Sequence, residues 1–443
     1  MNTRPKTIYL MLGALVIASM LLSSCGQATP TVATTQPATG QPATEKPVES
    51  NEKVTLNIWV FEGENAVFDE LIKAFNSDNL NITVVVTDFP ESDYTTKIDT
   101  ALIAGEPPDL GFIYEPKWIK SGAFLPLDDM IAQQGINTAD FNQGGWGRDC
   151  VLNGKVYCIG TYTGVILLFY NKDIFDAAGV AYPSATEPMT MDEYAEMCAK
   201  VTTKSDVLEE KVWGCDADIP IWWQDWRNFI SPDGHMVNGY ANDAATIHSF
   251  EALLKLRTDG SVISSSDSTS MEGTDLLATG KLATTIVDNV IAIATLETAG
   301  INWGAALVPV EQTGDETWVT GWTDGYGVFS ASKHPQEALS FLAYMGTKGQ
   351  QVRLDLGDLP LNMTFADQWA GDSVGRQEAI TAIRFARPNL FVPGYWDTIV
   401  PLYDGFYGAI IEDGRPVKDV LDEIAPQMQD TLNQAWETWD SIH

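Results

Sequence analysis

The sequence predicts an α/β protein with two lobes, each built on a mostly parallel sheet flanked by helices. Strand-like and helix-like segments alternate at the start of the folded body, which begins near Lys53, and this alternation requires parallel pairing. Residues 53–443 are too many for one core of ordinary size, so two lobes are expected. Apolar residues make up 45% of the sequence, which is the proportion of a globular protein.

The first strands and helices of the body follow from local patterns. Residues 54–60, 82–86 and 110–114 predict strands, and Pro107-Pro108-Asp109 opens the third. Two helices are predicted between them by apolar residues at helical spacing: Val67, Phe68, Leu71, Ile72 and Phe75 in one, and Tyr94, Ile98, Ala101 and Leu102 in the other. Because helices that link parallel strands place the strand ends on one rim, residues 62–65 and 114–118 are expected at that rim.

Three later helices are predicted from capping and periodicity. Thr190 and Glu193 form a capping box at the start of one, and Pro335 suits the first turn of another. Apolar residues at helical spacing over 417–432 predict a long amphipathic helix near the carboxyl end. In all three the apolar residues predict core packing and no chemistry.

The first fifty residues predict export and a lipid anchor. Arg4 and Lys6 precede an apolar stretch, 8–22, that is too short to span a bilayer. The Leu22-Ser23-Ser24-Cys25 that ends it resembles a bacterial lipobox, which implies cleavage before Cys25 and a lipid on its thiol. We expect a signal peptide at 1–24 and a lipidated, flexible Thr/Pro/Ala-rich tether at 25–52. The alternative is an ordinary signal peptide followed by an unmodified cysteine.

The net charge and the spacing of the histidines and cysteines limit the kinds of partner and cofactor to be expected. The 60 acidic and 26 basic residues give a formal charge of −34, which repels phosphate backbones and anionic lipids and argues against nucleic-acid binding. The four histidines are scattered singly and no CxxC spacing occurs, so neither a metal nor another cofactor is expected.

The four cysteines after Cys25 suggest two disulfides. The segment from Cys150 to Cys158 reads as a hairpin, and a three-residue loop at Asn153-Gly154-Lys155 would set the two cysteines opposite each other. Pairing them leaves Cys198 with Cys215 as the second bridge.

Several segments, in order along the body, resemble a known family. They are Ala104-Gly105-Glu106-Pro107-Pro108-Asp109, Gly122 to Asp129, Asn153 to Tyr157 followed by Leu167 to Asp173, Met189 to Glu193, Gly280-Lys281, and Ser332 to Ala338. On these residues the chain resembles the extracellular solute-binding lipoproteins of bacterial ABC importers, in the maltodextrin-binding-like class. Met191 departs from the pattern, because tryptophan is common at that position.

The resemblance implies the fold and the activity. It implies a type II periplasmic-binding-protein-like fold, with one lobe at 53–161 and 288–359 and the other at 162–287 and 360–443. Crossings between the lobes are then expected near 161–164, 284–287 and 359–362. Ligand bound between the lobes would stabilise a closed form that the permease subunits recognise. The protein is expected to be a monomer held at the outer face of the membrane, or in the periplasm, by its lipid alone, and not to be an enzyme.

An aromatic and acidic cluster suggests the kind of ligand. Trp222, Trp223 and Trp226 crowd a short segment together with Asp225. Indole faces stack on the C–H faces of a pyranose while carboxylates bond its hydroxyls, so the segment suits a sugar or oligosaccharide. The alternative for each tryptophan is core packing.

The other candidate ligand-binding residues come from matching the family's cleft segments one at a time. They are Glu62, Glu64, Tyr114, Glu115, Trp118, Tyr162, Asp288, Trp322 and Trp396. Maltodextrin binders carry a tryptophan shortly after the second crossing, whereas this chain has Asp288 there, which argues against a long malto-oligosaccharide as the ligand. Asp288 would either bond a sugar hydroxyl or cap the next helix.

The sequence is also compatible with three alternatives to a sugar-binding protein. Cages of aromatic and acidic residues also hold ammonium groups, so a polyamine is the main alternative ligand. A secreted carbohydrate-active enzyme could use Asp225 with Glu62 or Glu115 as acid and base. A structural or adhesive lipoprotein would bind no small molecule. Anionic solutes are disfavoured, because the expected cleft segments offer only Lys117, Lys120, Arg148 and Arg227 as countercharges.

Overall fold

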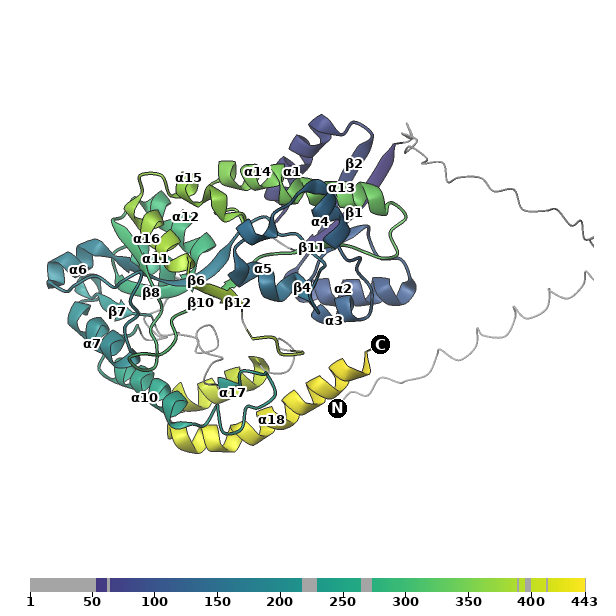
Figure 1. Cartoon of the computed structure of the whole chain (residues 1–443). Helices are drawn as coiled ribbons and strands as arrows, with labels where there is room; N and C mark the ends of the chain where they lie inside the picture. The colour runs from purple at the N-terminus through teal and green to yellow at the C-terminus, as the bar shows by residue number, and fades with distance from the viewer. Residues whose placement is uncertain are drawn as a thin grey trace, which may run out of the picture. The chain divides into compact units, whose positions relative to one another are not determined.

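The computed structural model describes residues 53–61, 64–216, 229–263, 273–388, 390–394, 400–411 and 413–442. Contacts group Asn51–His443 into one compact unit. Within this unit the strands form two main sheets, and the buried apolar residues form two large clusters, one around each sheet. In Figure 1 the strands β1, β2 and β11 are drawn apart from β6, β8, β10 and β12.

The first lobe is defined by the four-stranded sheet, whose strand order is β11-β3-β1-β2. Its strands are β1 (Val54–Phe61), β2 (Ile82–Phe89), β3 (Leu110–Phe112) and β11 (Tyr326–Val328), with the small hairpin β4 (Val151–Leu152) and β5 (Lys155–Val156). Its helices are α1 (Asn65–Asp78), α2 (Glu91–Ala104), α3 (Pro116–Lys120), α4 (Asp128–Gln134), η1 (Thr138–Asp140), α5 (Gln143–Asp149), α13 (Pro335–Gly346) and α14 (Lys348–Leu356).

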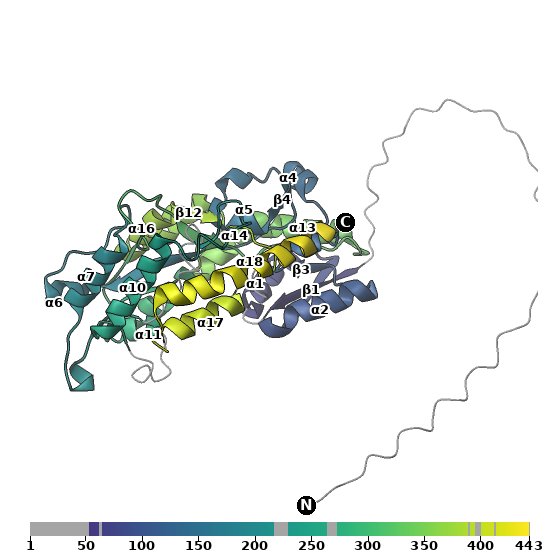
Figure 2. The same ribbon diagram turned by 90° about the horizontal axis from the view of Figure 1, so that it is seen from below.

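The second lobe is defined by the six-stranded sheet, in which β12-β10-β6-β8-β7 are neighbours and β9 also pairs with β6. Its strands are β6 (Gly164–Asn171), β7 (Trp213–Cys215), β8 (Leu282–Asp288), β9 (Trp303–Ala306), β10 (Val319–Trp322) and β12 (Ala386–Pro388). Its helices are α6 (Lys172–Ala178), α7 (Met191–Val201), η2 (Leu208–Glu210), α10 (Ala244–Thr258), α11 (Gly273–Ala278), α12 (Asn289–Ala299), η3 (Met363–Phe365), α15 (Ala366–Ala370), α16 (Val374–Ile383), α17 (Val400–Ile411) and α18 (Val417–Ser441). Figure 2 shows α17 and α18 side by side.

The local predictions from the sequence are confirmed. The first five elements are β1, α1, β2, α2 and β3, with β1 pairing in parallel with both β2 and β3. Both hydrogen bonds of the capping box at Thr190 and Glu193 are present at the start of α7. Pro335 opens α13, and the long helix near the carboxyl end is α18.

Each main sheet contains one strand that runs against its neighbours. In the first lobe β11 is antiparallel to β3, and in the second lobe β6 is antiparallel to β8, β9 and β10. Each of these strands is the one by which the chain enters its sheet from the other lobe. The chain therefore enters at the edge where the neighbouring strands end.

The sheets divide the chain at a different place from the predicted second crossing. Residues 284–287 lie inside β8, and α12, β9 and β10 then continue in the second lobe, with Leu296 and Trp303 in its core. The chain returns to the first lobe between Trp322 and Tyr326. The end of β8 resembles a crossing in sequence because an acidic cap follows a buried strand, but β9 and β10 still pair with β6.

Helix α5 packs the first lobe closely onto the second sheet. It leads away from Phe141 in the first core and contacts β10 and β12 through its glycines. A Cβ at Gly144 would lie 2.6 Å from the Cβ of Ala386, and one at Gly145 would overlap the backbone of Trp322. Glycine is required at both positions because backbone approaches backbone there.

Candidate functional site

Both sheets present one edge to the segments that connect the lobes. In the first lobe β1 and β3 end at this edge, and Tyr326, the first residue of β11, pairs with Phe112. In the second lobe Gly164 begins β6 opposite Trp322, the last residue of β10, and Asp288 ends β8 nearby. The carboxyl ends of the strands are where open α/β sheets bind ligands. We call this region, with the connecting segments 159–164, 322–326 and 357–362, the junction.

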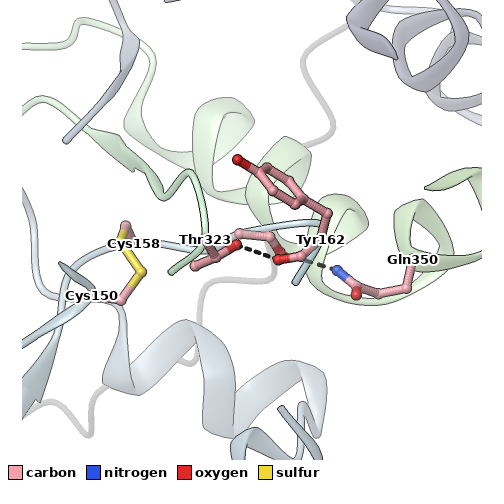
Figure 3. The surroundings of a disulfide bond; sticks show 6 residues. Cys150, Cys158, Tyr162, Thr323 and Gln350 are labelled. Carbon is pink, nitrogen blue, oxygen red and sulfur yellow. Dashed lines mark hydrogen bonds between the residues drawn. A yellow bond between two sulfur atoms is a disulfide. The ribbon is translucent and has the colours of Figure 1, made fainter. Parts of the chain in front are cut away.

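The three connecting segments are hydrogen-bonded to one another. The Thr323 hydroxyl donates to the Tyr162 carbonyl at 2.6 Å, which joins the second segment to the first. The Gln350 side chain donates to the Gly160 carbonyl at 3.1 Å and accepts from the Asn362 amide at 3.0 Å, which joins the first to the third. Figure 3 shows Thr323, Tyr162 and Gln350 beside the Cys150–Cys158 disulfide.

A buried arginine ties the same segments together. Arg353, 4% exposed, forms ion pairs with Glu64 at 2.6 Å and with Asp358 at 2.9 Å. Its Nε donates to the Thr161 hydroxyl at 2.8 Å, and its guanidinium lies 4.8 Å from the centre of the Tyr162 ring. Burial lowers the pKa of Arg353, but Glu64 and Asp358 more than compensate, so the pKa is raised and the charge is fixed.

Two tyrosines beside this arginine keep their protons. Burial raises the pKa of Tyr162 well above its usual value, and the nearby Asp324 and Glu64 carboxylates raise it further. The same causes act on Tyr326. The Tyr326 hydroxyl is fully buried and has no hydrogen-bond partner among the described residues.

Asp288 caps a helix. Its Oδ1 accepts a hydrogen bond from the Val290 amide at 2.6 Å, at the start of α12. This is the second of the two roles expected from the sequence. Burial raises the pKa of Asp288 to about 7, the Val290 amide opposes this, and Asp358 adds to it.

The predicted role of Trp118 in ligand binding is wrong for this structure. Trp118 is 2% exposed, lies in the core of the first lobe, and donates its indole N–H to Asp99 at 2.6 Å. Spacing from the third strand did not reveal that the side chain turns inward, where it meets Tyr94 of α2.

Three other candidates lie at or next to the junction. Tyr114 follows β3, is half-buried, and its hydroxyl lies 3.5 Å from Glu91 Oε1. Glu115 is 9% exposed at the N-cap of α3. Trp322 is half-buried at the end of β10, where a Cβ on Gly164 would lie 2.6 Å from its indole nitrogen. Glycine at position 164 therefore makes room for the Trp322 ring at the junction.

The remaining predicted residues lie outside the described residues: Cys25, Glu62, Trp222, Trp223, Asp225, Trp226 and Trp396. The described residues that flank the tryptophan segments are placed by the sheet. Cys215 ends β7, which is parallel to β8, and Pro388 ends β12, which is parallel to β10. Both strands therefore end at the edge that faces the junction.

The cysteines give one confirmation and one correction. Cys150 and Cys158 form a disulfide with a Cα–Cα distance of 4.7 Å, as predicted. The turn between them is a two-residue Asn153-Gly154 turn with both φ angles positive, because Leu152 pairs with Lys155, and not the three-residue loop expected.

Cys198 and Cys215 are free thiols, so the predicted second disulfide is wrong. They are neighbours, on α7 and β7, and both are fully buried. Burial raises the pKa of Cys215 well above its usual value, and a hydrogen bond with Cys198 adds to this. The two cysteines act as small core residues.

Two of the cations expected near the ligand are bound to other groups of the protein. Lys117 pairs with Asp99 at 3.0 Å and Lys120 contacts Trp439, so two of the four expected countercharges are engaged elsewhere. The role of Arg353 at the junction was not expected from the sequence. The one feature that could have indicated it is that Arg353 and Gln350, one turn earlier, both lie on the buried face of α14. Among the described residues no group of three or more His, Cys, Asp and Glu side chains is placed to hold a metal ion.

Comparison with known proteins identifies the family. Residues 61–352 match the family model of bacterial extracellular solute-binding proteins, and the chain belongs to that family. It is 22% identical over 366 residues to the melibiose/raffinose/stachyose-binding protein of Bacillus subtilis, covering 76% of this chain and 81% of that one.

Two solved structures show the same fold. The sugar-binding protein MalE from Xanthomonas citri superposes with a TM-score of 0.72 at 17% identity, covering 87% of this chain and 99% of that one. An ABC substrate-binding protein from Listeria monocytogenes in complex with cycloalternan gives 0.69 at 19% identity, covering 87% and 100%. The α/β fold is therefore the two-lobe fold of type II periplasmic binding proteins, as predicted.

Proposed function

We propose that this protein is the substrate-binding component of an ABC importer and captures a neutral sugar or oligosaccharide at the junction. The observation that carries the proposal is the topology: both sheets direct the same kind of edge toward the three connecting segments. A ligand held there touches both lobes. Such a ligand stabilises the closed form relative to the open form by the difference between its binding free energies for the two forms.

The chemistry of the junction favours a ligand without net charge. Arg353, the buried cation at the junction, is already paired with Glu64 and Asp358, and Lys117 is paired with Asp99. An anionic solute that approached Arg353 or Lys117 would have to displace one of these carboxylates. Sugars need hydroxyl partners and an apolar face, and the B. subtilis relative is named for binding melibiose, raffinose and stachyose.

The residues proposed to contact ligand combine the two lobes. Tyr114 and Glu115 would act from the first lobe and Trp322 from the second. From the segments outside the described residues we propose Glu62, Trp222, Trp223, Asp225, Trp226 and Trp396 on the basis of their residue types. Glu64 and Tyr162 belong to the buried arginine network and would act by holding the junction in shape.

We also propose the cellular setting from the sequence. Cys25 would carry a lipid that holds a monomeric chain at the outer face of the membrane, and ABC permease subunits would receive the ligand. Among the described residues no helix is both long enough and apolar enough to cross a bilayer. The chain belongs to a family of binding proteins, and we propose that it releases its ligand chemically unchanged.

A thermal-shift screen of the chain from residue 26 tests the proposal. The panel contains neutral oligosaccharides, monosaccharides, polyamines and phosphorylated sugars. A ligand that binds only the folded state should add about 2.7 kcal/mol at a hundredfold excess over its dissociation constant. A response confined to neutral sugars supports the proposal, whereas a response confined to polyamines, or turnover of a sugar, contradicts it.

Variants then locate the site. With a responding sugar, Trp322→Ala and Trp396→Ala should each raise the dissociation constant about fivefold or more, since each removes a stacking face worth about 1 kcal/mol or more. Tyr182→Ala is the matched control, because Tyr182 packs on Tyr170 and Phe175 at the opposite end of β6. Equal losses in all three variants would contradict the placement of the site.

A further inference from the structure

The last helix, α18, has an anchored part and a projecting part. Its buried residues run from Val417 to Leu432 and belong to the core of the second lobe. Residues 433–441 contain no buried residue and extend the helix by about 13 Å. We call this segment the arm.

The arm is held in place on the second-lobe side by aromatic contacts. Trp436 stacks on His235 with a ring separation of 4.1 Å and donates its indole N–H to the Gly234 carbonyl at 2.8 Å. Trp439 packs on Phe391 at 4.9 Å. The direction of the arm is therefore fixed by residues of the second lobe.

The end of the arm reaches the first lobe. Lys120, the last residue of α3, donates from Nζ to the Trp439 carbonyl. The same Nζ lies 4.6 Å from the centre of the Trp439 ring and 3.9 Å from Asp440 Oδ1. Helix α3 is fixed in the first-lobe core by Trp118 and Ile119. Figure 1 shows the carboxyl end of α18 beside α3.

Electrostatics explain why a lysine from another lobe sits there. The last turn of α18 contains no basic residue, and Glu437 and Asp440 add negative charge where the helix dipole is already negative. Lys120 supplies the missing cation and also lies over an indole, which attracts it further. Its side chain is 23% exposed, so water screens the contact only in part.

We propose that Lys120 and the arm form a latch between the lobes. Helix α3 follows β3 at the edge that faces the junction, so opening the lobes separates Lys120 from Trp439. The latch contributes to the closed form without touching ligand, and so raises ligand affinity indirectly. The inference rests on the lobe closure in the proposed function.

The test measures the distance between the lobes in the absence of ligand. Spin labels at Ile103→Cys on α2 and Val374→Cys on α16 report it, because both sites are exposed, at 89% and 59%, and lie on different lobes. The remaining described cysteines are either paired or buried. Double electron–electron resonance on the chain from residue 26 then gives the populations of the short and long distances.

Lys120→Gln should lower the ratio of closed to open form roughly three- to tenfold, since it removes both the helix-end charge and the cation–π contact. Lys120→Arg should keep most of the wild-type ratio. Lys348→Gln, which removes an exposed ion pair with Asp78 in the same lobe, should change nothing.

If the ratio of closed to open form were the same in the wild type and in Lys120→Gln, the latch would be overturned and lobe closure would stand. An equal shift in Lys348→Gln would also overturn the latch. A single distance in every variant, unchanged by a sugar that binds, would overturn the lobe closure on which both the latch and the proposed mechanism of capture rest. The two failures are therefore distinguishable.

Discussion

Replacing Arg353 by methionine should destabilise the folded protein strongly. Arg353 is 4% exposed and bonds three partners on different segments: Glu64 at 2.6 Å, Asp358 at 2.9 Å and Thr161 at 2.8 Å. Methionine keeps most of the apolar volume but leaves two carboxylates, 15% and 26% exposed, without their cation. Removing one partner of a buried ion pair costs about 3–5 kcal/mol, and we expect a loss of that size.

Urea unfolding followed by tryptophan fluorescence measures this loss. The matched control is Lys348→Met on the same helix, because Lys348 forms an exposed ion pair with Asp78 and the variant should unfold close to the wild type. Adding Glu64→Gln and Asp358→Asn to Arg353→Met should recover part of the stability, since no buried charge is then left unpaired. A loss below about 1 kcal/mol, the range of exposed pairs, would refute the reasoning.

Three further predictions concern buried polar side chains and the cysteines. Tyr326→Phe should leave the free energy of unfolding unchanged or higher, because its buried hydroxyl has no partner among the described residues, whereas Tyr94→Phe, whose hydroxyl bonds the Trp59 and Phe112 carbonyls at 3.1 Å, should lose about 1 kcal/mol in the same urea assay. The pKa of Asp288 is raised to about 7, so between pH 4 and 7 the folded state holds a proton that the unfolded state has lost, and the contribution of this residue to the unfolding free energy should fall with pH by at most about 1.4 kcal/mol per unit. The wild type should therefore lose stability relative to Asp288→Asn as the pH rises from 4 to 7, and a gain relative to that variant would contradict the assignment. Replacing Cys150 and Cys158 by serine should cost about 2–3 kcal/mol for a loop of this length, and thiol counting on the denatured, unreduced wild-type body should find the two free cysteines of α7 and β7 and no more.

The parts of the fold that depend on neighbouring residues were predictable from the sequence. The strands and helices from β1 to β3 follow apolar periodicity, and the capping box at Thr190 forms both of its bonds within one turn. The Asn153-Gly154 turn was recognised for the same reason, although its length was wrong by one residue. Each of these features depends on only a few residues of chain.

The second crossing could not be placed because it depends on pairing between distant residues. The end of β8 carries the same local signs as a crossing, and only the antiparallel pairing of β9 and β10 with β6 keeps residues 289–322 in the second lobe. The glycines at 321, 325 and 327 did indicate the place where the chain returns to the first lobe. A Cβ on Gly325 would overlap the disulfide, so the returning chain must be glycine there.

Prediction of the candidate site met the same limit, because local residue type was informative and distant partners were not. Residue type identified aromatic and acidic side chains as candidates for ligand binding, but it did not show which of them are buried in a core. Trp118 turns inward because Asp99, 19 residues earlier, accepts its indole N–H. Glu64 was identified as a carboxylate at the right edge, yet its partner Arg353 lies 289 residues away in sequence. No spacing rule connects such pairs.

The connecting segments indicate how the lobes can move while the buried arginine keeps its bonds. Residues 161–163 and 359–361 form a short antiparallel ribbon, in which Thr163 N–H donates to Leu359 at 2.9 Å and Leu361 N–H to Thr161 at 3.2 Å. Two-stranded ribbons twist more strongly than wider sheets. Since Arg353 and Gln350 both reach this ribbon from α14, they hold the end of the ribbon that belongs to the first lobe. If the lobes open as proposed, the arginine network can move with the first-lobe end and stay intact, so Arg353→Met should change stability much more than the ratio of closed to open form, whereas Lys120→Gln should do the reverse.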